Sequence, residues 1–130
     1  MYETHSMLQA EFAYDSRLDV EFLNELYEGD KEHALTIFEQ FLRNVHGQLK
    51  EVEDNFNSRD IESMRQKIHK MKPSFSFVGL SHLTLKAGQV ENECDRNMAT
   101  GQLGELYNDF KKSVIEYIPI IEKQLVKLKE

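Results

Sequence analysis

The sequence predicts an all-α protein, an antiparallel up-and-down four-helix bundle with a short extra N-terminal helix. Two observations lead to this prediction. Apolar residues recur every three or four positions along almost the whole chain, which is the spacing of an amphipathic helix. Glycine and proline are scarce, at 6 and 2 of 130 residues, whereas a β-sandwich or barrel needs many tight turns. Long helical stretches with few turns between them are typical of a bundle.

The short helix is expected to begin near residue 19 and to end before Gly29. Asp30 and Asp60 each precede a long apolar stripe, and both are expected to act as N-caps because a carboxylate can accept from the unpaired amides of a first turn. The first two stripes comprise Ala34, Phe38, Phe41, Val45, Leu49, Val52 and Phe56, and then Ile61, Met64, Ile68, Met71, Phe75 and Val78.

The second half of the chain predicts two further helices. Gly79 is expected to end the helix before it, since glycine takes the left-handed conformation without a Cβ penalty, and Ser81 is expected to cap the next one. A polar stretch at residues 97–104 then turns the chain. The two stripes comprise Leu83, Ala87, Val90 and Cys94, and then Leu103, Tyr107, Phe110, Val114, Ile118, Ile121, Leu125 and Leu128.

The length is that of one ordinary domain. We expect residues 1–17 to form an N-terminal arm and residues 18–130 to form the bundle. An extended coiled coil is the alternative fold, but it requires sustained heptads. The breaks at Gly29, residues 57–60, Gly79 and Gly101 argue against it.

Composition excludes several functions. The net charge of −7 argues against non-specific binding to nucleic acid or to an anionic membrane, because both attract basic surfaces. A single cysteine, Cys94, excludes an internal disulfide and a multi-cysteine zinc site. The sequence shows neither a secretory signal nor an apolar stretch of about 20 residues. We therefore expect a soluble cytoplasmic protein.

The residue best suited to chemistry is His69, which lies one step off the core stripe of the helix predicted at residues 61–78. None of its neighbours on that helix face is a large aliphatic residue, so the imidazole is predicted to be exposed between cations and compact side chains. These neighbours are Glu62, Arg65, Lys72, Pro73 and Ser76.

This setting suits phosphoryl transfer. A neutral imidazole nitrogen is a nucleophile near neutral pH without help from a base. Phosphoryl transfer needs mainly positioning and neutralisation of the charge on the moving oxygens. Lys72, one turn along, could reach a phosphoryl group on His69. Pro73 removes the intrahelical partner of the His69 carbonyl, so we expect a local bend or widening there.

These residues resemble the motif of the histidine-containing phosphotransfer (HPt) family of two-component phosphorelays. In that family a histidine is followed by any residue, an aliphatic, lysine, glycine and serine, and a glycine stands ten residues after the histidine. The chain departs from the pattern at Pro73, where the family usually has glycine, and the resemblance covers roughly residues 12–128. The matching residues are His69, Met71, Lys72, Ser74 and Gly79.

The resemblance implies roles for the residues near the histidine. His69 would be phosphorylated, with Lys72 as its electrostatic partner. Ser74 would support the local turn or form a nearby hydrogen bond, and Gly79 would allow the tight turn that follows. Counting from Gly79 places Glu91 where the family often has a glutamine that holds the imidazole. A carboxylate there could orient a ring N–H but would repel a phosphoryl group.

The resemblance also implies partners. Receiver domains of response regulators and a hybrid sensor histidine kinase would dock around His69, on a face that includes Arg65, Ser76 and Phe77. Phe77 lies just off the core stripe, so it could instead be a packing residue, which we favour. The chain has no Gly-rich phosphate loop or kinase signature. We therefore expect a phosphotransfer carrier, not an ATP-dependent kinase, that needs no cofactor and is a monomer.

Two other functions deserve comparison. A bundle that binds a di-iron centre needs two inward Glu-x-x-His pairs, whereas the chain offers one Asp30-x-x-His33 at a helix start, so no metal is expected. A non-catalytic interaction module, without phosphotransfer, stays open as the alternative. The remaining histidines are given no chemical role: His5 is in the arm, His33 in a first turn, and His46 and His82 are expected at the surface.

Overall fold

The structure, a computed structural model, describes residues 12–96 and 101–130. Within these ranges the chain forms five α-helices and no β-strand, as the sequence predicts. The helices are α2 (Val20–Tyr27), α3 (Lys31–Asn57), α4 (Ile61–Phe77), α5 (Ser81–Asp95) and α6 (Gly101–Lys129). None of the described helices is both long and apolar enough to cross a membrane.

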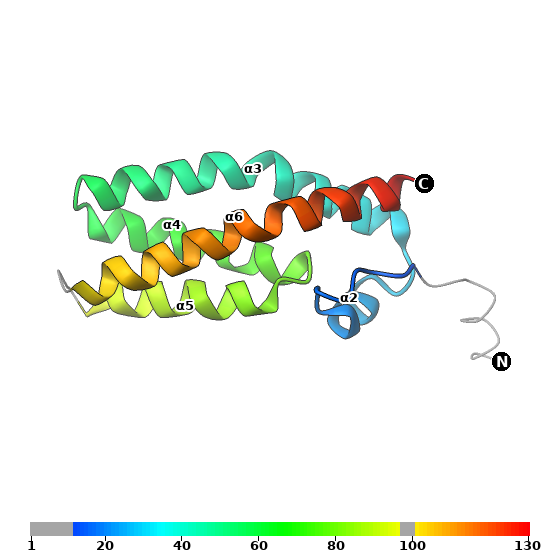
Figure 1. The fold of residues 1–130 in the computed structure, drawn as a ribbon, viewed down its shortest axis with the longest axis horizontal. Coiled ribbons are helices and arrows are strands. Elements are labelled where there is room, and N and C mark those ends of the chain that lie inside the picture. Colours follow the sequence, from blue (N-terminus) through cyan, green and yellow to red (C-terminus); the bar gives the residue numbers. More distant parts are fainter. Residues whose placement is uncertain (1–11, 97–100) are drawn as a thin grey trace.

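The four long helices form the predicted bundle, with successive helices running in opposite directions (Figure 1). Each long helix contacts the next along the chain, and α6 returns to contact α3, which closes the bundle. The short α2 lies at one end of it, beside the start of α3. In this order α4 and α5 are neighbours, so their facing side chains can form one site.

Aromatic rings fill the centre of the bundle. Phe75 of α4 meets Phe41 of α3 and Phe110 of α6, with ring centroids 5.9 and 5.7 Å apart, and all three rings are buried. Each such side chain stabilises the fold by about 1.5–3 kcal/mol through its removal from water. This packing holds the buried side of α4 in place. Of the predicted stripe residues, Leu49, Phe56, Ile61 and Leu125 are only partly buried.

The predicted caps are confirmed for two helices. The carboxylate of Asp30 accepts from the His33 amide at 3.0 Å, and that of Asp60 accepts from the Ser63 amide at 3.2 Å. The prediction for Ser81 is wrong. Leu80 occupies the N-cap of α5 without a side-chain hydrogen bond.

Ser81 is the first residue of α5, and its hydroxyl donates instead to the Asp19 carboxylate, 2.7 Å away. The Asp19 carboxylate, which also caps α2, therefore binds the Ser81 hydroxyl.

The turn predicted at residues 97–104 is also too long. Residues 97–100 lie outside the described part of the chain, and the segment from Gly101 to Gly104 already belongs to α6.

Three contacts fasten α2 to the end of α4. The Asp19 amide donates to the Gly79 carbonyl at 2.8 Å, and the Tyr27 hydroxyl donates to the Phe77 carbonyl at 2.6 Å. Gly79 has a φ of 79° and lies against Leu18 and Leu23. The last carbonyl groups of a helix have no donor within the helix and need other partners. Here the segment around α2 supplies donors for carbonyl groups at the end of α4 and in the turn that follows it.

Part of the predicted N-terminal arm lies against the bundle. Phe12 and Tyr14 pack on the core, and the Asp15 amide donates to the buried Gln124 side chain of α6 at 2.7 Å. Residues 1–11 lie outside the described part of the chain, so the boundary between residues 17 and 18 stays a prediction.

Acid should weaken the local turn in which the Asp15 carboxylate accepts hydrogen bonds from Arg17. Hydrogen bonds from Arg17 lower the pKa of the Asp15 carboxyl to about 2. Since the folded state binds this proton more weakly than the unfolded chain, the stabilising contribution is complete above the ordinary pKa of about 4 and is lost as the pH falls toward 2. An NMR titration of the Asp15 carboxyl should show this midpoint, and Arg17→Gln should raise it. An unchanged midpoint in Arg17→Gln would contradict the assignment.

Candidate functional site

His69 projects from the middle of α4 into solvent. Its side chain is 65% exposed, as predicted from its position one step off the core stripe. The neighbouring Ile68 and Met71 are buried, so the backbone beneath the imidazole is held by the core while the ring stays accessible. An exposed nitrogen nucleophile on a rigid helix is therefore available to a second protein.

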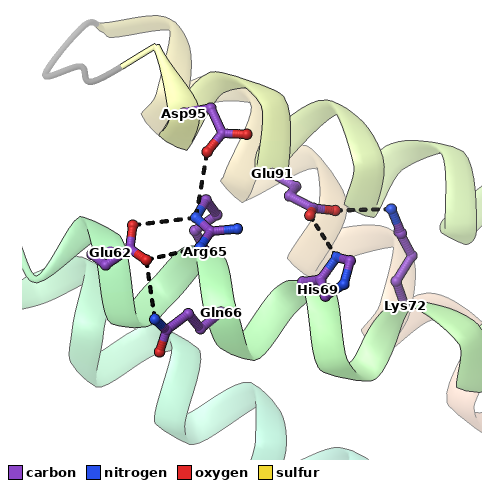
Figure 2. A network of polar contacts seen from close by, with 7 residues as sticks. All are labelled: Glu62, Arg65, Gln66, His69, Lys72, Glu91 and Asp95. Atoms are coloured by element: carbon purple, nitrogen blue, oxygen red, sulfur yellow. Dashed lines mark hydrogen bonds and ion pairs between the residues drawn. The ribbon is translucent and has the colours of Figure 1, made fainter.

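Glu91 of α5 contacts the His69 ring. Its Oε2 lies 2.6 Å from Nδ1 of His69 (Figure 2), and its side chain is only 12% exposed. An ionised carboxylate can only accept hydrogen bonds, so Nδ1 must carry the proton and donate it. The Nε2 of the neutral ring then keeps its lone pair. The contact therefore leaves Nε2 as the ring nitrogen with a free lone pair.

The other oxygen of Glu91 binds Lys72. The Lys72 ammonium donates to Oε1 at 2.8 Å. Burial alone would raise the pKa of Glu91, but hydrogen bonds from Lys72 and His69 and the charge of Lys72 lower it below its usual value. Glu91 is therefore ionised near neutral pH, and Lys72 is directed at this carboxylate in the unphosphorylated protein.

Arg65, the second cation on this face, is held by two carboxylates (Figure 2). Its guanidinium forms ion pairs with Glu62 at 2.7 Å and with Asp95 of α5 at 3.3 Å, and Gln66 also donates to Glu62. The sequence predicted a histidine flanked by cations. The structure shows that each cation on the His69 face is already paired, so the face is close to electrically balanced.

The smaller residues near His69 have local roles. The hydroxyl of Ser74 donates to the Met71 carbonyl at 2.6 Å, which agrees with the predicted nearby hydrogen bond. Ser76 lies 2.8 Å from the Thr84 hydroxyl of α5 and so links the two helices. Pro73 is exposed and α4 continues through it to Phe77; the bend expected at Pro73 stays a prediction.

Phe77 borders a groove between α3 and α4. Its side chain is 42% exposed, so it is not simply a core residue. The groove has a volume of about 210 Å³, and the lining is uncharged, with apolar and amide side chains. The lining residues are Ile37, Gln40, Phe41, Asn44, Gln48, Ser74 and Phe77.

The other histidines differ from His69 in their settings. His33 and His46 are exposed, and His5 lies outside the described residues. His82, which is expected at the surface, is only partly exposed. Its ring packs on Tyr117 with centroids 4.5 Å apart, and its Nε2 is buried without a hydrogen bond in the described structure. This burial lowers the pKa of His82.

Cys94 is buried, as predicted, and burial raises the pKa of its thiol to about 11. It is therefore not a reactive thiolate near neutral pH. Within residues 12–96 and 101–130, no group of three or more histidine, cysteine or acidic side chains is placed to hold a metal ion.

Sequence reasoning missed the partners that Arg65 and Ser76 find on α5. A signal for one of them was present. Asp95 follows Glu91 by four residues on α5, and Arg65 precedes His69 by four on α4. Because the two helices are antiparallel, one turn forward on α5 lies opposite one turn back on α4. Once Glu91 is placed opposite His69, Asp95 must lie near Arg65.

An all-helical bundle that displays one hydrogen-bonded histidine from the middle of a helix has the arrangement of a histidine phosphotransfer domain. The family model described as Hpt domain matches residues 36–117, which is more than half of the chain and includes both His69 and Glu91. The chain therefore belongs to the Hpt domain family, and its general role is histidine phosphotransfer in a phosphorelay. Comparisons with curated proteins and with solved structures gave no match.

Proposed function

We propose that the protein is a phosphorelay carrier that accepts a phosphoryl group on His69 from a receiver-domain aspartate and passes it to another response regulator. The observation on which this rests is the exposed His69 ring, whose Nδ1 is bonded to Glu91 at 2.6 Å. Because that bond leaves the Nε2 lone pair free, the ring can attack phosphorus without a separate base.

The step can be written with its atoms balanced. Nε2 of His69 attacks the phosphorus of the receiver's aspartyl phosphate, and a P–N bond forms. The bond between phosphorus and the aspartate oxygen breaks, and the aspartate leaves with the electron pair as a carboxylate. The proton on Nδ1 stays in its hydrogen bond to Glu91. Passing the group to a second receiver is the reverse of this step.

Lys72 supports transfer electrostatically in this proposal. Its ammonium has three N–H donors, and one of them is on Glu91 at 2.8 Å. The others are available to the oxygens of a phosphoryl group on the same face. Charge-assisted bonds of this kind stabilise the moving group, which is the main requirement of phosphoryl transfer.

The docking surface for receiver domains would extend from Arg65 past His69 to Phe77 and the groove beside it. Phe77 lies eight residues after His69 on α4, about 12 Å along the helix axis. Its exposed ring and the uncharged groove offer apolar contact next to the nucleophile, and aromatic residues are common in the centre of interfaces. Ser76 and Pro73 stay compact and leave access to His69.

The proposal implies the remaining properties expected from the sequence. A carrier obtains its phosphoryl group from a hybrid sensor histidine kinase through that kinase's receiver domain, and it needs neither ATP nor a cofactor of its own. It works as a monomer, in the cytoplasm, where its partners are.

Transfer profiling against the receiver domains of the host tests the function. Each receiver is phosphorylated on its aspartate and mixed with the protein. We expect an acid-labile, base-stable label, located on Nε2 by ³¹P and ¹⁵N NMR. Binding of receivers without any label would instead support the non-catalytic interaction module.

A further inference from the structure

A second polar site lies at the end of the bundle where α2 and the C-terminal end of α6 are found (Figure 1), whereas His69 lies in the middle of α4. A hollow of about 430 Å³ opens there between the segment before α2 and the last turns of α6. Tyr117 of α6 already contacts His82 near the start of α5, so residues 123–127 lie beyond the α4–α5 turn. The charged and polar residues that line the hollow are Tyr14, Asp15, Arg17, Lys123, Gln124 and Lys127.

The charge of this hollow is opposite to that of the whole protein. Three cations and one carboxylate line it, which gives a net charge of +2 (three minus one) in a chain of net charge −7. Lys123 and Lys127 are exposed, and neither has an ion-pair partner in the described part of the chain. They lie one turn apart on α6, where like charges repel. A bound anion would relieve that repulsion.

Asp15 does not offset these lysines, because Arg17 already occupies both of its carboxylate oxygens. The backbone amide and Nε of Arg17 each donate to Oδ1 at 2.9 Å, and a terminal guanidinium nitrogen donates to Oδ2 at 2.7 Å. A guanidinium has five N–H donors, so Arg17 keeps three of them for other partners. The pair of Asp15 and Arg17 is neutral as a unit and still presents donors to the hollow.

A buried amide adds a further donor. Gln124 is 1% exposed, and its Oε1 accepts from the Asp15 amide at 2.7 Å. That bond fixes which end of the side-chain amide is oxygen, since a backbone N–H needs an acceptor. Among the described residues Nε2 of Gln124 has no acceptor, and an unpaired buried donor is costly. An acceptor in the hollow that Gln124 lines would satisfy it.

We propose that this hollow is a binding site for a small phosphate-bearing anion, either inorganic phosphate or a phosphomonoester. A phosphoryl group has three terminal oxygens and up to two negative charges, so it can accept from both lysines, from Arg17 and from the buried amide together. A carboxylate has only two oxygens and one charge, and it would leave donors unused.

The size of the hollow also bears on the ligand. A water molecule takes up about 30 Å³ of liquid, so 430 Å³ admits a phosphoryl group together with an organic part. The ring of Tyr14, which packs on Phe38, lines the hollow and offers that part an apolar contact. The proposed site is separate from His69, so it holds whether or not His69 is phosphorylated.

Titrations of the full-length protein with inorganic phosphate and with phenyl phosphate, at an ionic strength held constant with sodium chloride, test the site. We expect saturable changes in the ¹H–¹⁵N signals of the Gln124 side-chain amide and of the Asp15 and Arg17 backbone amides. The dissociation constant for phosphate should be on the order of 1 mM. Tighter binding of phenyl phosphate would assign the site to phosphomonoesters, and equal affinities would assign it to free phosphate.

Lysine variants connect the signals to the site without disturbing the core. Lys123→Gln and Lys127→Gln each remove one exposed charge, so each should fold normally and bind phosphate about fivefold more weakly. Lys112→Gln is the matched control. It removes the same charge from another exposed position on α6 that does not line the hollow, and it should bind phosphate like the wild type. His69→Gln should do so as well.

Three results would overturn the proposal. Changes that do not saturate, or that spread over exposed lysines including Lys112, would mean an adventitious ion only. An unchanged phosphate affinity in the double variant of Lys123→Gln and Lys127→Gln would show that the two ammonium groups do not hold the anion. Changes confined to His69 and Lys72 would show that phosphate binds at the phosphotransfer site instead.

Discussion

Replacing His69 by glutamine should abolish phosphorylation of the protein by receiver domains while leaving its fold intact. Glutamine offers no ring nitrogen with a nucleophilic lone pair, so no P–N bond can form. The side chain is 65% exposed, and its core neighbours on α4 are untouched. The free energy of unfolding should therefore change by no more than about 0.5 kcal/mol, the usual range for surface changes. Label incorporation and circular dichroism measure the two effects.

His46→Gln is the matched control for this experiment. His46 is also an exposed histidine on a long helix, α3, but the described structure gives it no carboxylate partner like Glu91. It should be labelled at the wild-type rate. Label that persists in His69→Gln, or that is lost in His46→Gln, would mean that His69 is not the acceptor.

Gly79→Ala should destabilise the fold more than any exposed substitution. Gly79 has a φ of 79°, where an alanine is strained by about 1–2 kcal/mol. A Cβ there would also lie 2.7 Å from Leu23 Cδ1 and 3.2 Å from the Asp19 amide nitrogen. Because that nitrogen is backbone and donates to the Gly79 carbonyl, it cannot move without breaking the fastening of α2. Such overpacking costs about 1–3 kcal/mol more.

Two other glycines allow the two costs to be separated. Gly29 has a φ of 82°, but nothing lies within 4 Å of its added Cβ, so Gly29→Ala should show only the conformational cost. Gly47 lies inside α3 in open space, and Gly47→Ala should stabilise the protein by about 0.5–1 kcal/mol. Chemical denaturation measures all three variants. Equal losses of unfolding free energy in Gly79→Ala and Gly29→Ala would show that the added Cβ at Gly79 is accommodated without a steric cost.

The turn at Gly79 also connects stability to function. It joins α4, which carries His69, to α5, which carries Glu91. The register between these helices is further fixed by the contacts of Ser76 with Thr84 and of Arg65 with Asp95. A change that loosens this turn should therefore move Glu91 away from the ring as well as lower stability.

The sequence by itself determined the fold class and the exposed position of His69. The apolar stripes specify the buried side of each helix because the helical period is fixed. His69 lies off its stripe, and none of its neighbours on that helix face is a large aliphatic residue, so it is predicted to face outward. Asp30 and Asp60 specify helix starts through interactions within four residues. These are local properties, so neighbouring residues suffice to predict them. Ser81 fails as a cap because its competing partner, Asp19, is 62 residues away in sequence.

The tertiary structure decided which hydrogen bonds and ion pairs the residues of the site form. Counting placed Glu91 opposite His69, but only the packing of α5 on α4 shows that its two oxygens are divided between the ring and Lys72. The same packing pairs Arg65 with Asp95 and buries one edge of His82 on Tyr117. Ion pairs and partial burial depend on the rotation and separation of two helices to within about an ångström, and hydrophobic periodicity carries no information at that precision. The sequence locates the histidine, and the packing of the neighbouring helix determines which of its ring nitrogens is hydrogen-bonded and which is left free.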